Sequence, residues 1–178
     1  MTNSYDLVYN WFEIMKAKYG IKTTAYTIMP NHVHCILFFP TENYDLNKIV
    51  GNGKRFMAYE IVKKLEAAND SKTLLQLKEG LTDRDVKKGQ KHKVFEDSFD
   101  AKPIYHRDFL LQKINYIHLN PVRGKWRLVE HWEDYEYSPP RRKSFMKKTS
   151  WMVLCRFILK SFLDSRFVSV VPGLSVER

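Results

Sequence analysis

The stretch AYTIMPNHVHCILFF, residues Ala25 to Phe39, decides the fold because it holds two extended runs on either side of a turn. Lys22 to Met29 leads to the turn pair Pro30-Asn31, and His32 to Phe39 is a β-branched and aromatic run that is typical of a strand. The pattern predicts either a hairpin or one long strand that is interrupted by a bulge at the proline.

Two histidines lie two residues apart in the second run. Because strand side chains alternate between faces, His32 and His34 project to one side, whereas Val33 and Cys35 project to the other. This is the simplest way to present two nitrogen ligands to one metal ion. Two histidines on one strand face are more often structural, so the pair needs a third ligand before it indicates a metal site.

Helices are expected on both sides of these runs. Ser4 to Tyr19 has apolar residues at three- and four-residue spacing and stops at Gly20. Asp45 to Ala68 has a second apolar face, although its early glycines weaken the start. The other expected elements are a short helix and loop over Thr73 to Gly89, extended pieces over His92 to Tyr105, and an apolar segment over Trp151 to Val171 that is compatible with an amphipathic helix.

A third helix carries the second informative stretch, INYIHLNP, residues Ile114 to Pro121. Asp108 can cap this helix, and Asn120-Pro121 closes it. Tyr116 and Asn120 lie on one stripe, about 6 Å apart along the axis, whereas His118 points away from Asn120 and is a poor third ligand. Taken alone, such a tyrosine usually serves packing, and an asparagine before proline usually just ends a helix.

Composition places the chain among ordinary globular proteins. Its 178 residues predict one domain, without an apolar run long enough for a membrane span, and a polar N-terminus without signal-peptide layout predicts a cytoplasmic location. Cys35 and Cys155 are expected to be free buried thiols. The net charge of +10 invites a polyanionic partner, and residues 139–178 hold most of the excess, with 9 basic against 2 acidic side chains.

The two informative stretches together resemble a known family. AYTIMPNHVHCILFF and INYIHLNPVRGKW (Ile114 to Trp126) are similar to the two signature blocks of the REP-associated and insertion-sequence single-tyrosine transposases of the HUH type. The first block contains the histidine–hydrophobic–histidine element, and the second contains the tyrosine helix. The segments VFEDSFDAKPIY (Val94 to Tyr105) and EDYEYS (Glu133 to Ser138) also resemble family segments, so the likeness covers roughly Ser4 to Ser138.

The resemblance implies a fold and a chemistry. The family fold is an α+β, ferredoxin-like (RRM-like) antiparallel sheet with helices packed on one face and the HUH motif on a sheet strand. By position, His32, His34 and Asn120 would hold a divalent metal, Mg²⁺ or Mn²⁺, and Tyr116 would attack DNA to give a 5′-phosphotyrosine. The implied substrate is single-stranded DNA with a hairpin-forming end.

Basic residues near the tyrosine are candidates for contact with the DNA backbone. Lys113, one turn before Tyr116, can steady the phosphate or can be a solvated lysine. Arg123 and Lys125 follow the helix and are plausible backbone contacts.

The chain departs from the family pattern at both ends. The family has a strand before its first helix, so the sheet is expected to lack one strand or to have an edge filled by another subunit of a homodimer. After Ser138 the sequence leaves the family pattern and becomes basic. Residues 1–138 are therefore predicted to form the transposase-like domain, and residues 139–178 a basic, diverged tail. Two alternatives remain: a non-catalytic module that binds hairpin or single-stranded DNA, and, with less support, a histidine-dependent hydrolase.

Overall fold

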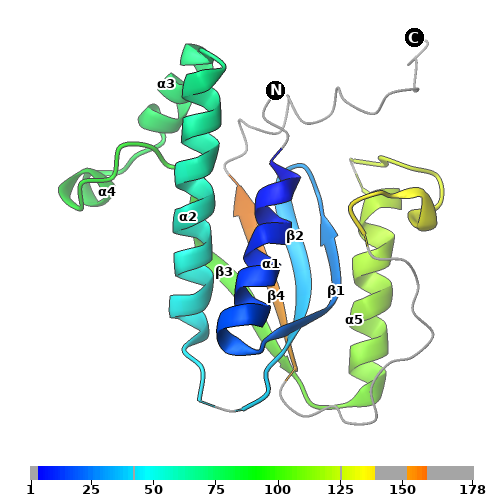
Figure 1. Ribbon diagram of the computed structural model, residues 1–178. Helices are drawn as coiled ribbons and strands as arrows, with labels where there is room; N and C mark the ends of the chain where they lie inside the picture. The colour runs from blue at the N-terminus through cyan, green and yellow to red at the C-terminus, as the bar shows by residue number, and fades with distance from the viewer. Residues whose placement is uncertain (1–3, 42, 125, 139–151, 160–178) are drawn as a thin grey trace.

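The computed structural model describes residues 4–41, 43–124, 126–138 and 152–159 (Figure 1). The elements follow in the order α1 (Tyr5–Tyr19), β1 (Lys22–Ile28), β2 (His32–Phe38), α2 (Leu46–Ala67), α3 (Ser71–Glu79), α4 (Asp83–Lys87), β3 (Phe95–Ile104), α5 (Arg107–Leu119), the short 3₁₀ turns η1 (Asn120–Val122) and η2 (Trp132–Asp134), and β4 (Met152–Leu159).

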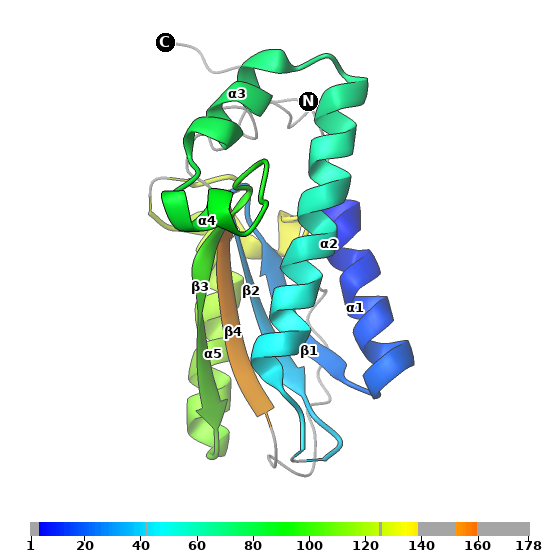
Figure 2. The same cartoon turned by 90° about the vertical axis from the view of Figure 1, so that its left-hand side faces the viewer.

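One antiparallel sheet with the strand order β1-β2-β4-β3 organises the molecule. Helices α1 and α2 cover one face, and α5 lies alone against the other, as the two views show together (Figures 1 and 2). The α+β class and the ferredoxin-like antiparallel sheet are thus confirmed, whereas the expectation that the helices pack on one face is wrong, because α5 forms a second core on the opposite face. Of the two arrangements left open for residues 22–39, the hairpin is correct, because β1 pairs with β2 from Lys22 to Ile28, with one register shift between Thr23 and Ala25.

Local sequence explains where these elements begin and end. Gly20 terminates α1 in the left-handed conformation, with φ 66°, which a residue without a Cβ adopts at no steric cost. Asp45 begins α2 by accepting a hydrogen bond of 3.0 Å from the Lys48 amide. The structure places His106, not Asp108, at the N-cap of α5, and Asp108 lies in the first turn, where its charge favours the helix dipole.

The strand β4 corrects two expectations for the C-terminal part. Residues 152–159 are a strand, not part of an amphipathic helix, and they lie between β2 and β3. The strand that the sheet was expected to lack therefore comes from the same chain, and it occupies the interior of the sheet, not an edge. Phe157 and Cys155 are both almost completely buried in the core under α1 and α2.

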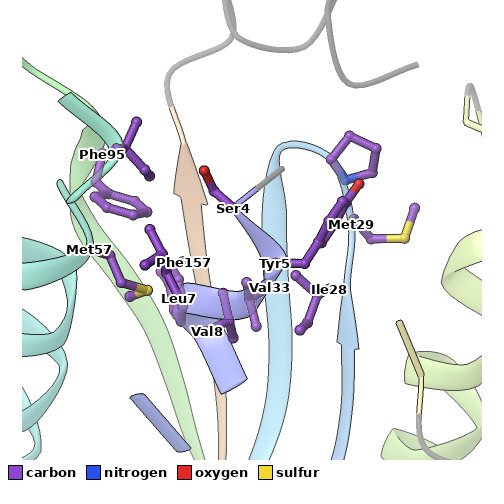
Figure 3. A pocket seen from close by; sticks show the side chains of 12 residues that line it. Ser4, Tyr5, Leu7, Val8, Ile28, Met29, Val33, Met57, Phe95 and Phe157 are labelled. Atoms are coloured by element: carbon purple, nitrogen blue, oxygen red, sulfur yellow. The ribbon is translucent and has the colours of Figure 1, made fainter. Parts of the chain in front are cut away.

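The end of β4 lies close to the start of α1. Phe157 and Ser4 line one apolar pocket together with the end of the β1–β2 hairpin (Figure 3). The backbone register agrees, because Ile158 of β4 is opposite His32 at the start of β2. Strand β4 thus follows the other described elements in sequence, but it lies inside the sheet and ends next to the start of α1.

The interface between α1 and α2 depends on one glycine. A Cβ on Gly53 would come within 2.7 Å of Trp11 Cδ1, and Trp11 is buried, whereas a Cβ on Gly51 would meet nothing within 4 Å. Gly51→Ala is expected to raise the free energy of unfolding by about 0.5–1 kcal/mol through helix propensity alone. Gly53→Ala is expected to lower it by about 1–2 kcal/mol, because overpacking outweighs the same gain.

Urea denaturation of the two variants measures this difference, and each is the control for the other. Equal stabilisation by both substitutions would contradict the close approach of the two helices at Gly53.

Among the helices of the described residues, none combines the length and the apolarity that a membrane crossing requires.

Candidate functional site

The alternation of β2 sorts its side chains as expected. Val33, Cys35 and Leu37 belong to the core under α1 and α2. His32 and His34 project to the face that carries α5, with ring centroids 4.9 Å apart and ring planes at 86°. Both imidazoles are buried, and His34 is only 2 % exposed.

Helix α5 brings Tyr116 to this histidine pair. Leu110, Ile114 and Ile117 anchor the helix on the sheet, in a second core that includes Ile36 of β2. The neighbouring stripe then carries Tyr116 against His34, with ring centroids 5.3 Å apart at 84°. Tyr116 remains 47 % exposed, so one side of its ring is open to a large ligand.

The His34 side chain has the properties of a metal ligand. Neither its Nδ1 nor its Nε2 has a hydrogen-bond partner in the described part of the protein, although both atoms are buried. Burial, the neighbouring His32 and the charge of Arg156 lower the pKa of His34 to about 3, so the imidazole is neutral and has a lone pair to donate. Buried polar atoms are normally satisfied, so an imidazole without partners fits a site where one of its nitrogens binds a metal ion.

Asn31 orients the other histidine. Its Oδ1 lies 2.6 Å from Nδ1 of His32, which fits donation by Nδ1–H and leaves Nε2 as the ligand atom. Sequence reasoning assigned Asn31 to the turn alone and missed this contact. The signal was the position of a short side-chain amide directly before a candidate ligand.

Asn120 lies one turn after Tyr116, at the junction of α5 and η1. Its Nδ2 donates a 2.9 Å hydrogen bond to the Tyr116 carbonyl oxygen, which fixes the amide at the end of the helix. No group of three His, Cys, Asp or Glu side chains suited to a metal ion occurs among the described residues. The role of Asn120 as a third ligand therefore stays a prediction.

The basic candidates differ in how closely they approach Tyr116. Lys113 is half-buried, and its Nζ lies 5.9 Å from the Tyr116 ring centroid. Arg123 is exposed at the C-terminal end of η1, and Lys125 lies outside the described residues. His118, expected to be a poor ligand, stacks on Trp132 with centroids 4.2 Å apart.

Arg156 is a site residue that sequence reasoning missed. It lies within the apolar segment for which an amphipathic helix was expected, but in β4 it is the direct register partner of His34. Residues opposite each other in neighbouring strands share a face, so the guanidinium group belongs to the same face as the histidines and Tyr116. Only knowledge of the strand order would have revealed this.

Comparison with known proteins identifies part of this arrangement. The model of the family described as "Transposase IS200 like" matches residues 3–76, which include α1, the hairpin with both histidines, and α2. The match ends before Tyr116, so it does not extend to the second signature block. No curated protein and no solved structure matches the chain.

Proposed function

Because residues 3–76 belong to the IS200-like transposase family, which acts on DNA, we propose that this protein nicks and rejoins single-stranded DNA with Tyr116 as nucleophile. The observation that carries the proposal is the contact of Tyr116 with His34, at 5.3 Å between ring centroids. These residues come from elements far apart in sequence, and Tyr116 lies outside the segment that the family model matches.

The reaction conserves the energy of the phosphodiester bond. The Tyr116 Oη–P bond forms while the P–O3′ bond breaks; the phenol gives up its proton, and the leaving 3′ oxygen takes one up. The products are a 5′-phosphotyrosine and a free 3′-OH. Attack by another 3′-OH reverses the step and joins DNA without ATP.

A protonated phenol is a weak nucleophile, so the phosphate must be activated. We assign this to a divalent ion, Mg²⁺ or Mn²⁺, which when bound polarises the phosphate oxygens as a Lewis acid. His32 and His34 would hold it through neutral imidazoles, with Asn31 orienting His32. The amide oxygen of Asn120 is the proposed third ligand, since imidazole and amide oxygen both suit Mn²⁺.

The proposed substrate is a single strand, with a hairpin beside the cleavage point. A duplex backbone lacks the freedom to bring one phosphate close to both Tyr116 and the histidine pair. Lys113 is suited to the phosphate next to Tyr116, because its Nζ lies beside that ring. Arg123 and Lys125 are proposed contacts of the DNA backbone farther from the reacting phosphate, and their loss should weaken binding of all sequences alike.

The metal site predicts a reversal of stability in His34→Leu. Without metal, this variant is expected to be more stable than the wild type by about 1–2 kcal/mol, because it removes two buried nitrogens that lack partners among the described residues. With Mn²⁺ at about 100 times its dissociation constant, the wild type gains about 2.7 kcal/mol and the variant gains nothing. Urea denaturation in EDTA and in Mn²⁺ measures both effects, and equal gains in the two proteins would contradict a site at His34.

A covalent adduct assay tests the activity itself. Single-stranded oligonucleotides tiled across the DNA on both sides of the gene are incubated with the protein and Mn²⁺, and denaturing gels reveal protein that is bound to DNA. The alternative of a non-catalytic binding module predicts retained DNA and no adduct. A strand missing from the sheet would favour that module, but β4 occupies the interior of the sheet.

A further inference from the structure

The sheet face under α5 changes from apolar to polar along the strands. At one end, its side chains pack on α5 in the second core: Ile36, Ile104, Met152, with Phe38 and Leu154 against them. Toward the other end, the register aligns His34, Arg156 and Asp100 in one row across β2, β4 and β3. Tyr116 lies over the His34 end of this row.

The Nε atom of Arg156, in the middle of this row, is buried. This atom has no hydrogen bond within the described residues. None of the ion pairs found in that part of the chain includes Arg156, although Asp100 is its register partner on β3. A guanidinium offers five donors in a planar fork, and leaving a buried donor unpaired is unfavourable, so a ligand with acceptor atoms would satisfy the buried Nε.

The charge distribution identifies that ligand as an anion. The guanidinium of Arg156 is a permanent cation beside the neutral imidazole of His34. A metal ion held by the histidines would add a second positive charge that repels it. A phosphate bound between the metal ion and Arg156 would attract both positive charges. The planar guanidinium fork also matches two phosphate oxygens better than an ammonium does.

We propose that Arg156 binds non-bridging oxygens of the phosphate that Tyr116 attacks, and that it stabilises the charge on them in the transition state. This inference rests on the proposed function. It makes Arg156 a catalytic residue that the C-terminal strand delivers to a site otherwise built from β2 and α5. The competing explanation is that the positive charge of Arg156 only balances the negative charge of Asp100 on the neighbouring strand.

Two measurements on three variants test the inference. Arg156→Gln removes the charge, and Arg156→Lys keeps it without the fork. Lys102→Gln is the matched control, because Lys102 is an exposed cation on the neighbouring strand β3, opposite Leu154 on the same face of the sheet. Adduct formation is followed in single turnover with the oligonucleotide that the wild type cleaves. Binding of fluorescent (dT)20 is measured against salt in a Tyr116→Phe background, which excludes cleavage.

Arg156→Gln is expected to slow adduct formation about 100-fold or more. It should also reduce the slope of log affinity against log salt by about 0.7, the value for one phosphate contact on a single strand. Arg156→Lys should keep the slope and lose most of the rate, Lys102→Gln should change the rate less than about threefold, and all three should keep the stabilisation by Mn²⁺.

The slope decides the inference, and the adduct decides the proposed function. An Arg156→Gln slope equal to that of the wild type overturns the phosphate contact, whatever the rate does. If the wild type forms no adduct but the slope still falls in Arg156→Gln, the transesterase proposal is wrong and the phosphate contact stands. If neither occurs, both are wrong.

Discussion

Tyr116→Phe is expected to abolish the covalent protein–DNA adduct, with a loss of at least about a thousandfold in the rate of strand cleavage. The reason is chemical, because phenylalanine offers no oxygen to form the bond to phosphorus. The fold should be unchanged, since the ring still packs on His34 and Tyr116 is 47 % exposed in the wild type. Gel analysis of the adduct, together with the thermal midpoint of the variant, measures both parts.

Tyr105→Phe is the matched control for this experiment. Tyr105 is also exposed and lies directly before the N-cap of α5, but it has no ring contact with either histidine among the described residues. The control should form adduct at the wild-type rate. Affinity of Tyr116→Phe for single-stranded DNA should also be retained, which separates the chemical step from binding. An adduct that persists in Tyr116→Phe would assign the nucleophile to another residue.

Deletion of residues 152–178 is expected to unfold the protein. It removes β4 from between β2 and β3, which leaves the facing backbone groups of both strands unpaired. It also removes Phe157, a fully buried side chain whose truncation alone costs about 3–5 kcal/mol, against a total stability of about 5–15 kcal/mol for a typical domain. Near-ultraviolet circular dichroism should show no fixed aromatic environment.

A permuted chain provides the rescue. The same deletion variant, with residues 152–159 and a flexible linker of about six residues fused N-terminally to Ser4, should recover a cooperative unfolding transition. The end of β4 and the start of α1 line one pocket, so a short connection suffices (Figure 3). A deletion variant that folds without the added strand would contradict the central position of β4, and a permuted chain that stays unfolded would contradict its direction.

The histidine pair and the tyrosine helix were predictable because both depend on local periodicity. Two-residue alternation fixes the faces of His32 and Val33 wherever the strand goes, and helical spacing separates Tyr116 from the apolar stripe that includes Ile114. Placing Tyr116 against His34 needed the resemblance to a family, since no local pattern relates two elements about 80 residues apart.

The C-terminal strand was not predictable in the same way. The segment MVLCRFIL, which forms β4, is apolar on both sides of a single arginine, and short apolar runs do not distinguish a buried strand from a buried helix. The segment can be assigned as a strand only once the sheet order is known, because β2 and β3 leave space for one strand between them. Arg156 was missed for the same reason, because its importance comes from its register with His34 and not from its neighbours in sequence.

The most direct test of the account is to map the adduct by tandem mass spectrometry. After nuclease and trypsin treatment, cleavage at Lys113 and Arg123 releases residues 114–123, a peptide in which Tyr116 is the one tyrosine. We predict a nucleotide attached through a 5′-phosphate to Tyr116 in this peptide. A nucleotide on any other residue, or no modified peptide from protein that has bound and been incubated with its DNA and Mn²⁺, would contradict the account.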